Sequence, residues 1–136
     1  MIVALVLVVV ALLHVSWGLG GRWPAKDDAG LAALVVGTRG AMPSPLACHV
    51  VAVLLGIAAV LVASASGAFV LPMPPIVTAI GAWGVVLVLG ARGLGGFVEA
   101  RFRPEVRELP YHRWNLVLYS PLCLAVAGLA ALGIAR

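Results

Sequence analysis

The side chains that could ligate a metal, transfer a proton or bind a polar group lie near the ends of long apolar segments. Those beside the charged stretches of the chain are His14, Trp17, Cys48, His49, Arg92, Asn115, Tyr119, Ser120 and Cys123. Polar side chains within apolar segments are costly in a lipid bilayer and usually face the interior of a helix bundle. We therefore expect these residues to occupy one half of the molecule and to mark any functional site.

Acid–base chemistry is the reaction that three of these residues suggest. A histidine and a tyrosine in a dry pocket can donate and accept protons, which are the roles we assign to His14 and Tyr119. Arg92 can stabilise a developing anion. The remaining candidates for ligand contacts are Trp17, His49, Asn115, Ser120 and Cys123. Structural roles compete with these assignments, because tryptophans settle at membrane interfaces and arginines extend to lipid phosphates. Enzymatic activity is therefore left open.

His14 and His49 also raise the question of a cofactor. Two histidines at similar depth on neighbouring helices could ligate a haem, and Cys48 and Cys123 could hold a metal with them. The spacing matches no recognised metal-binding motif. We therefore assign no metal ligands, favour neutral imidazoles or one histidine as a proton carrier, and expect both thiols to be free.

The last apolar segment carries a polar stripe. Asn115, Tyr119 and Cys123 are spaced four residues apart, so a regular helix places them on one face. Pro121 cannot donate to the carbonyl of Val117, and we expect the helix to bend there.

Four apolar segments must position these residues. The chain is 63% apolar and only 10% charged, whereas soluble domains are about 25% charged. A bilayer core needs about 20 apolar residues per helix. The sequence predicts an all-α fold, an integral membrane bundle of four transmembrane helices. We expect one domain, residues 1–136, with helices at about 2–20, 46–66, 74–93 and 116–135.

The charged loops predict the orientation in the cell membrane. Residues 21–45 and 92–115 hold eight of the nine Lys and Arg residues, and the connection 67–75 holds none. Because basic loops remain in the cytoplasm, the loops 21–45 and 94–115 should be cytoplasmic and both termini outside. The positive charge is explained by this bias and by contacts with membrane lipids, so no nucleic-acid partner is expected.

Both basic loops contain further predicted structure. The apolar run Ala29–Val36 is too short to span, and we expect an interfacial or re-entrant helix capped by Asp28. In the second loop, the helix should continue to Arg103, which can pair with Glu99 before Pro104 ends it. Tyr111 is expected at the membrane interface.

Three motifs carry a resemblance to a known family. The sequence resembles small bacterial four-helix membrane proteins catalogued as a domain of unknown function, through the strings from His14 to Gly21, from Arg92 to Phe97 and from Leu118 to Leu124. The resemblance covers nearly the whole chain and implies a shared cluster of these residues. Members tend to carry an aspartate at the position of Asn115 and often an acid at that of Gly96. Glu99 is the nearest substitute for either carboxylate.

These observations favour a polar pocket, open to the cytoplasm, that binds a small lipophilic molecule and possesses groups for acid–base chemistry, such as isomerisation or cyclisation of an isoprenoid-like substrate. The alternative is a non-catalytic membrane subunit or scaffold whose polar cluster only joins the helices. A channel would need a continuous polar path, which the apolar half of the segments opposes.

Overall fold

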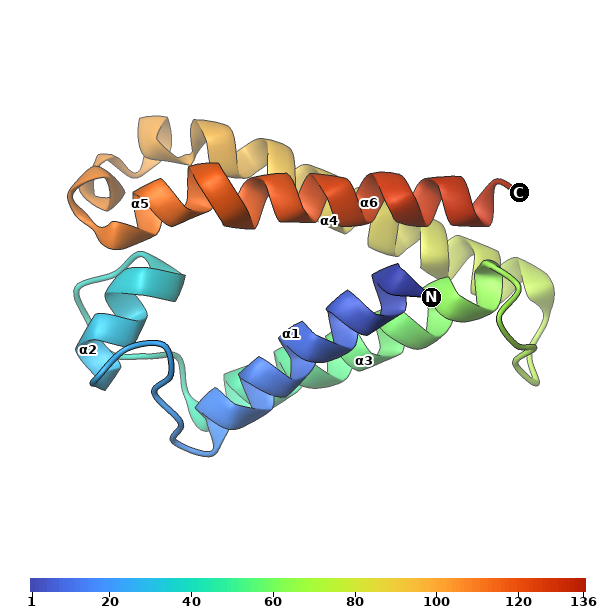
Figure 1. The fold of residues 1–136 in the computed structure, drawn as a ribbon, viewed down its shortest axis with the longest axis horizontal. Coiled ribbons are helices and arrows are strands. Elements are labelled where there is room, and N and C mark those ends of the chain that lie inside the picture. The colour runs from blue at the N-terminus through green and yellow to red at the C-terminus, as the bar shows by residue number, and fades with distance from the viewer.

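Two pairs of long helices form the molecule and diverge from a shared contact at one end (Figure 1). A computed structural model describes all residues, 1–136, and the fold is all-α. Helix α1 (Ile2–Gly18) packs along α3 (Pro45–Ala65), and α4 (Pro75–Phe102) packs along α6 (Ser120–Ile134). Short α5 (Pro110–Trp114) and the π-helical turn η3 (Asn115–Tyr119) continue directly into α6.

Prolines begin three of the long helices. Pro45, Pro75 and Pro110 lie in the first turn, where the missing N–H has no intrahelical partner to lose. The Ser44 side chain also accepts a hydrogen bond from the Ala47 N–H, at 3.2 Å. The helices Pro45–Ala65, Pro75–Phe102 and Pro110–Ile134 have the length and composition of membrane spans, whereas Ile2–Gly18 is apolar but shorter.

In the second half of the chain one predicted helix extension is present, and the start of the last long helix differs from the prediction. Helix α4 continues through Gly93 and Gly96 to Phe102, as expected of an extension that ends before Pro104. The last long helix begins at Pro110 rather than at 116, so Tyr111 and its neighbours belong to the helix and not to a loop. Between them, only the 3-10 turn η2 (Pro104–Glu108) and Leu109 reverse the chain.

The structure has a fifth, short helix besides the four long ones. It consists of α2 (Asp28–Leu31) and the π-helical turn η1 (Ala32–Val36), within the run that was expected to be interfacial or re-entrant. Its N-cap is Asp27 and not Asp28, because the Asp27 carboxylate accepts from the Gly30 N–H at 2.7 Å. Asp28 instead pairs with Arg22 at 3.0 Å, and this bond raises the pKa of Arg22 above its ordinary value.

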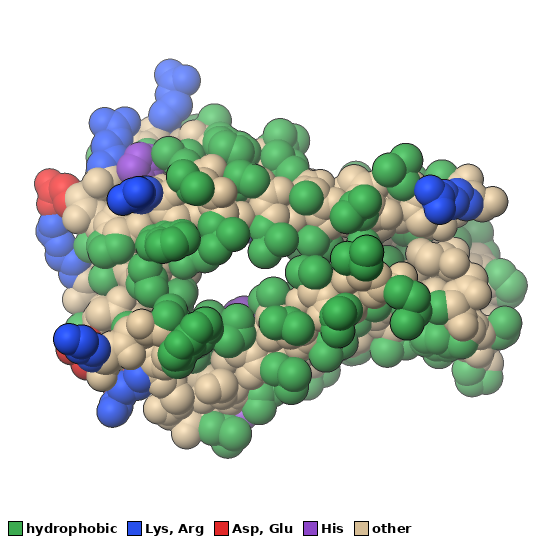
Figure 2. Space-filling model, viewed as in Figure 1, with side chains coloured by type: hydrophobic (Ala, Val, Ile, Leu, Met, Phe, Trp, Pro, Cys, Tyr) green, Lys and Arg blue, Asp and Glu red, His purple; other side chains and the backbone are tan.

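The apolar core joins the two pairs at one end only. Its buried members are Val3, Leu7, Ala59, Val62, Ala82, Val126 and Ala130. Several are alanines, which let helix backbones approach closely in the absence of bulky side chains. We call this the terminal end, because Met1 and Arg136 line a cavity beside it. The opposite end, formed by α2, η2 and α5, is the basic end, where Lys and Arg side chains gather (Figure 2).

An opening separates the two pairs between these ends. Figure 2 shows a gap that passes through the space-filling surface between the α1–α3 pair and the α4–α6 pair, with apolar side chains around it. The fifth helix lies across the basic end of this gap, beside α5 (Figure 1). The opening is therefore closed by the core at one end and by α2–η1 at the other.

Candidate functional site

A polar cluster lies where α4 packs on the last long helix near the basic end. Its members are Arg92, Glu99 and Arg103 from α4 or its end, and Tyr111, Asn115 and Ser120 from the segment Pro110–Ile134. Tyr111, Asn115 and Ser120 are buried. Each of the six side chains makes at least one hydrogen bond to another member.

Asn115 lies at the centre of the cluster and is only 1% exposed. Its Nδ2 donates to the Gly96 carbonyl at 2.8 Å and to Glu99 Oε2 at 3.3 Å. Its Oδ1 accepts from Arg92 Nη2 at 3.0 Å and from Ser120 Oγ at 3.1 Å. Both ends of the amide are therefore satisfied, which is the condition for burying a polar side chain cheaply.

A chain of hydrogen bonds connects the two arginines of the cluster. Arg92 Nη2 donates to the Tyr111 hydroxyl at 3.0 Å, and that hydroxyl donates to Glu99 Oε2 at 2.8 Å. Glu99 Oε1 accepts from Arg103 Nη1 at 2.8 Å, which is the pair predicted from the sequence. Arg92 itself forms no ion pair with a carboxylate. The Arg92 guanidinium is held in position by two neutral oxygens, those of the Tyr111 hydroxyl and the Asn115 amide.

The same cluster anchors the fifth helix. Arg103 Nη2 donates to the Gly37 carbonyl at 2.8 Å, and the Tyr119 hydroxyl donates to the Leu34 carbonyl at 3.2 Å. Gly37 ends η1 with a φ of +76°, and a Cβ there would lie 2.6 Å from the Tyr111 ring. Glycine is thus required both by the left-handed backbone and by the close approach of the ring.

Glycines in α4 allow the contact that builds the cluster. A Cβ on Gly96 would lie 1.9 Å from Ser120 Oγ, and one on Gly93 would lie 2.7 Å from the Leu124 side chain. The absence of these Cβ atoms lets the α4 backbone approach α6 closely enough for the Gly96 carbonyl to accept from Asn115. The glycine-rich string of the sequence therefore serves helix packing.

The π-helical turn changes which residues share a face. The N–H of Ser120 donates to the carbonyl of Asn115, five residues earlier, so the turn holds one extra residue. As a result Asn115 bonds to α4 and to Ser120, whereas Tyr119 bonds to η1. The expected single stripe through Asn115, Tyr119 and Cys123 is therefore divided. The turn ends at Tyr119, two residues before Pro121, whose nitrogen carries no hydrogen to donate.

Three predicted site residues meet in the cluster, namely Arg92, Asn115 and Ser120. The sequence interpretation missed Tyr111 as a member and did not select Glu99 or Arg103 for the site. One signal could have identified Glu99, because it is the only acidic side chain in the 28 residues of α4. Tyr111 carried no such signal, since an aromatic residue beside a span is expected at the membrane interface.

Tyr119 lies beside the cluster, with its ring centroid 6.1 Å from that of Tyr111, whereas the predicted site residues of α1 and α3 make separate contacts. His14 Nδ1 donates to the Val10 carbonyl at 2.8 Å, and the imidazole packs edge-on against Trp17. His49 Nδ1 donates to the Pro45 carbonyl at 2.7 Å. The Trp17 indole N–H donates to the Trp23 carbonyl at 2.8 Å. His14, Arg92 and Tyr119, assigned to acid–base chemistry, thus each contact different partners.

No three side chains among His, Cys, Asp and Glu lie close enough together to hold a metal ion. Cys48 and Cys123 are free thiols. A cavity of about 420 Å³ lies at the terminal end among Met1, Val62 and Leu129.

The chain is thus an all-α protein with several long apolar helices and a polar cluster near one end. Residues 7–130 match the family described as protein of unknown function (DUF3995), and the chain belongs to that family. No curated protein and no solved structure matches the chain.

Proposed function

We propose that this chain is an integral membrane protein that binds a small lipophilic molecule in the opening between its two helix pairs. In this proposal the four long helices span the cell membrane, the basic loops face the cytoplasm and both termini lie outside. Helix α1, with 17 residues, is at the lower limit of length for a span. The fifth helix then lies at the cytoplasmic interface, beneath the opening.

The opening itself carries the proposal (Figure 2). Space between apolar helices in a bilayer fills with apolar material. The bilayer core contains no water, and an empty space would lose van der Waals contacts. The core at the terminal end and α2–η1 at the basic end bound the opening along the membrane normal. A molecule that enters sideways from the lipid is therefore held at both ends.

One face of the last long helix lines the proposed site. Tyr119 contacts η1, while Val126 and Ala130 belong to the core shared with α1 and α3. Cys123 lies between them on the same face, because residues 119, 123, 126 and 130 repeat at helical spacing. This face passes from a polar end at Tyr119 to an apolar end at Ala130, which suits a molecule with one polar group.

His14 supplies the second polar group of the proposed site, after the Tyr119 hydroxyl. It follows Leu7 by seven residues and Val3 by eleven, so it shares the α1 face that enters the core. Because a carbonyl only accepts, the bond to Val10 places the proton on Nδ1 and leaves Nε2 of the neutral ring as an acceptor. A ligand hydroxyl could donate to this atom. Transformation of the ligand by acid–base chemistry would use this imidazole and the Tyr119 hydroxyl.

A scaffold or subunit without catalysis is the second candidate. The observation that favours it is the internal satisfaction of the polar cluster, in which Asn115 makes four hydrogen bonds to protein atoms. Such a cluster orients helices without needing a ligand. A stable protein partner recovered with the native chain, and no bound small molecule, would establish this alternative.

The test is the identity of small molecules that remain bound after purification. Mass spectrometry of the wild-type protein should detect one lipophilic species above the bulk phospholipid. Cys123→Trp should remove it by filling the opening. Val117→Trp is the matched control, because Val117 is 69% exposed on the outside of the same helix. The proposal fails if the wild type retains only bulk lipid, or if a folded Cys123→Trp variant retains the species.

A further inference from the structure

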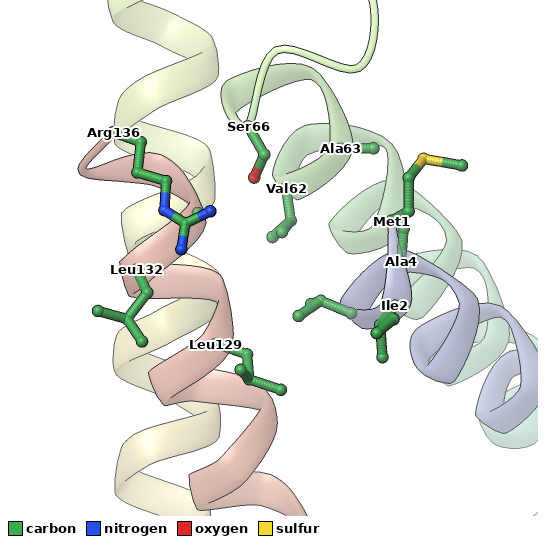
Figure 3. A pocket seen from close by; sticks show the side chains of 11 residues that line it. Met1, Ile2, Ala4, Val62, Ala63, Ser66, Leu129, Leu132 and Arg136 are labelled. Atoms are coloured by element: carbon green, nitrogen blue, oxygen red, sulfur yellow. The ribbon is translucent and has the colours of Figure 1, made fainter.

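A separate cavity lies at the terminal end, between α1, α3 and α6 (Figure 3). Its volume is about 420 Å³, within the range of about 300–1,000 Å³ that small-molecule sites occupy. Eight of its eleven lining residues are hydrophobic. Neither the polar cluster nor the opening at the centre of the molecule contributes to it.

The walls and the mouth of this cavity differ in polarity. Ile2, Val62 and Leu129 supply apolar walls from three different helices. Ser66, directly after the end of α3, and Arg136, after the end of α6, supply polar groups. Figure 3 shows the Arg136 guanidinium directed into the space between α6 and α3, on the side of Ser66 and Val62.

The charge at the mouth of the cavity favours an anionic group on the occupant. Arg136 forms no ion pair with an acidic side chain, and the neighbouring connection from Gly67 to Pro74 carries no charge of either sign. A guanidinium at the level where three helices end is placed for the phosphate of a lipid headgroup. The apolar walls continue from that level toward the core, as an acyl chain would.

We infer that this cavity binds one anionic phospholipid of the leaflet opposite the basic loops, with its phosphate on Arg136 and part of an acyl chain between α1, α3 and α6. The inference rests on the membrane placement proposed above and not on the ligand of the central opening. The lipid would complete the contact between the two helix pairs beside the core.

Native mass spectrometry of the full chain, released from micelles with added phosphatidylglycerol or phosphatidylcholine, tests the site. We expect one phosphatidylglycerol to be retained preferentially by the wild type. Arg136→Gln should weaken retention about ten- to hundredfold, the range that a charged hydrogen bond contributes. Arg101→Gln, an exposed arginine at the basic end, is the control and should bind as the wild type does.

A second variant tests the apolar part of the cavity. Ala63→Leu should fill it and also displace the lipid, while leaving the guanidinium in place. Unchanged retention of phosphatidylglycerol by a folded Arg136→Gln variant overturns the inference, as does equal retention of phosphatidylcholine by the wild type. Release of the protein from membranes by alkaline washing would instead refute the membrane placement itself, on which both proposals depend.

Discussion

Gly95 and Gly96 are neighbours in α4, but a methyl group would meet different surroundings at each. A Cβ on Gly96 would lie 1.9 Å from Ser120 Oγ, 2.8 Å from Arg92 Nη1 and 3.0 Å from Asn115 Oδ1, whereas nothing lies within 4 Å of one on Gly95. The pair therefore separates the effect of the polar cluster from the general effect of glycine in a helix.

We predict that Gly96→Ala lowers the free energy of unfolding by about 2 kcal/mol, because overpacking costs about 1–3 kcal/mol and hydrogen bonds of the cluster break as well. Gly95→Ala should be neutral or stabilising by up to about 1 kcal/mol, since alanine favours the helix. Reversible unfolding in mixed micelles, followed by circular dichroism, measures both. Equal destabilisation by the two substitutions would contradict the packing that we describe.

At the scale of the helices, the fifth helix depends on a cap that the sequence analysis placed one residue too late. Asp27 accepts from the Gly30 N–H, and Asp28 forms an exposed ion pair with Arg22. Loss of an N-cap costs about 0.5–2 kcal/mol, and an exposed ion pair contributes about 0.2–1 kcal/mol. The two carboxylates, although adjacent, are therefore not equivalent.

Asp27→Ala should increase hydrogen exchange of the amides from Gly30 to Leu34 severalfold, with a smaller increase for Asp28→Ala. Exchange followed by mass spectrometry, on protein in lipid nanodiscs, gives the comparison. Exchange in α3 serves as the internal reference and should not change in either variant. If Asp28→Ala has the larger effect, the cap is Asp28, as the sequence first suggested.

Hydropathy predicted the long helices well, because a span needs only composition and length. The helix extension to Phe102 and the pair of Glu99 with Arg103 also followed from local spacing. The π-helical turn at Asn115–Tyr119 did not, because one extra residue in a turn leaves no pattern in an apolar segment. The site was therefore predicted only in part: Arg92, Asn115 and Ser120 meet, whereas Tyr111 joins them through a helix that begins six residues earlier than expected.

At the scale of the whole molecule, the charge is concentrated at one end. Lys and Arg side chains gather around α2, η2 and α5, and Arg136 lies at the other end (Figure 2). In the proposed membrane placement this distribution determines the orientation, because basic loops are not translocated. The connection between α3 and α4 carries no charge, so translocating it across the bilayer has no charge penalty.

The proposed orientation predicts the reactivity of single cysteines in a Cys48→Ala, Cys123→Ala background. Arg107→Cys, in η2, should react with an impermeant maleimide only after the cells are opened. Ala68→Cys, in the connection between α3 and α4, should react in intact cells. Both positions are exposed, so a difference between them reports the side of the membrane and not burial. The reverse pattern would invert the topology.

The contacts that hold the fifth helix also determine when it can dock during synthesis of the chain. Leu34, Gly37 and Arg39 contact Tyr119, Arg103 and Glu108, which follow them by 85, 66 and 69 residues. The segment from Asp28 to Gly37 therefore leaves the ribosome long before any of these partners exists. Because chains begin to fold from the N-terminus as they are made, this segment cannot complete its contacts until the last long helix has been synthesised. A chain arrested before Arg103 would lack all three partners and leave its fifth helix undocked and open to proteases.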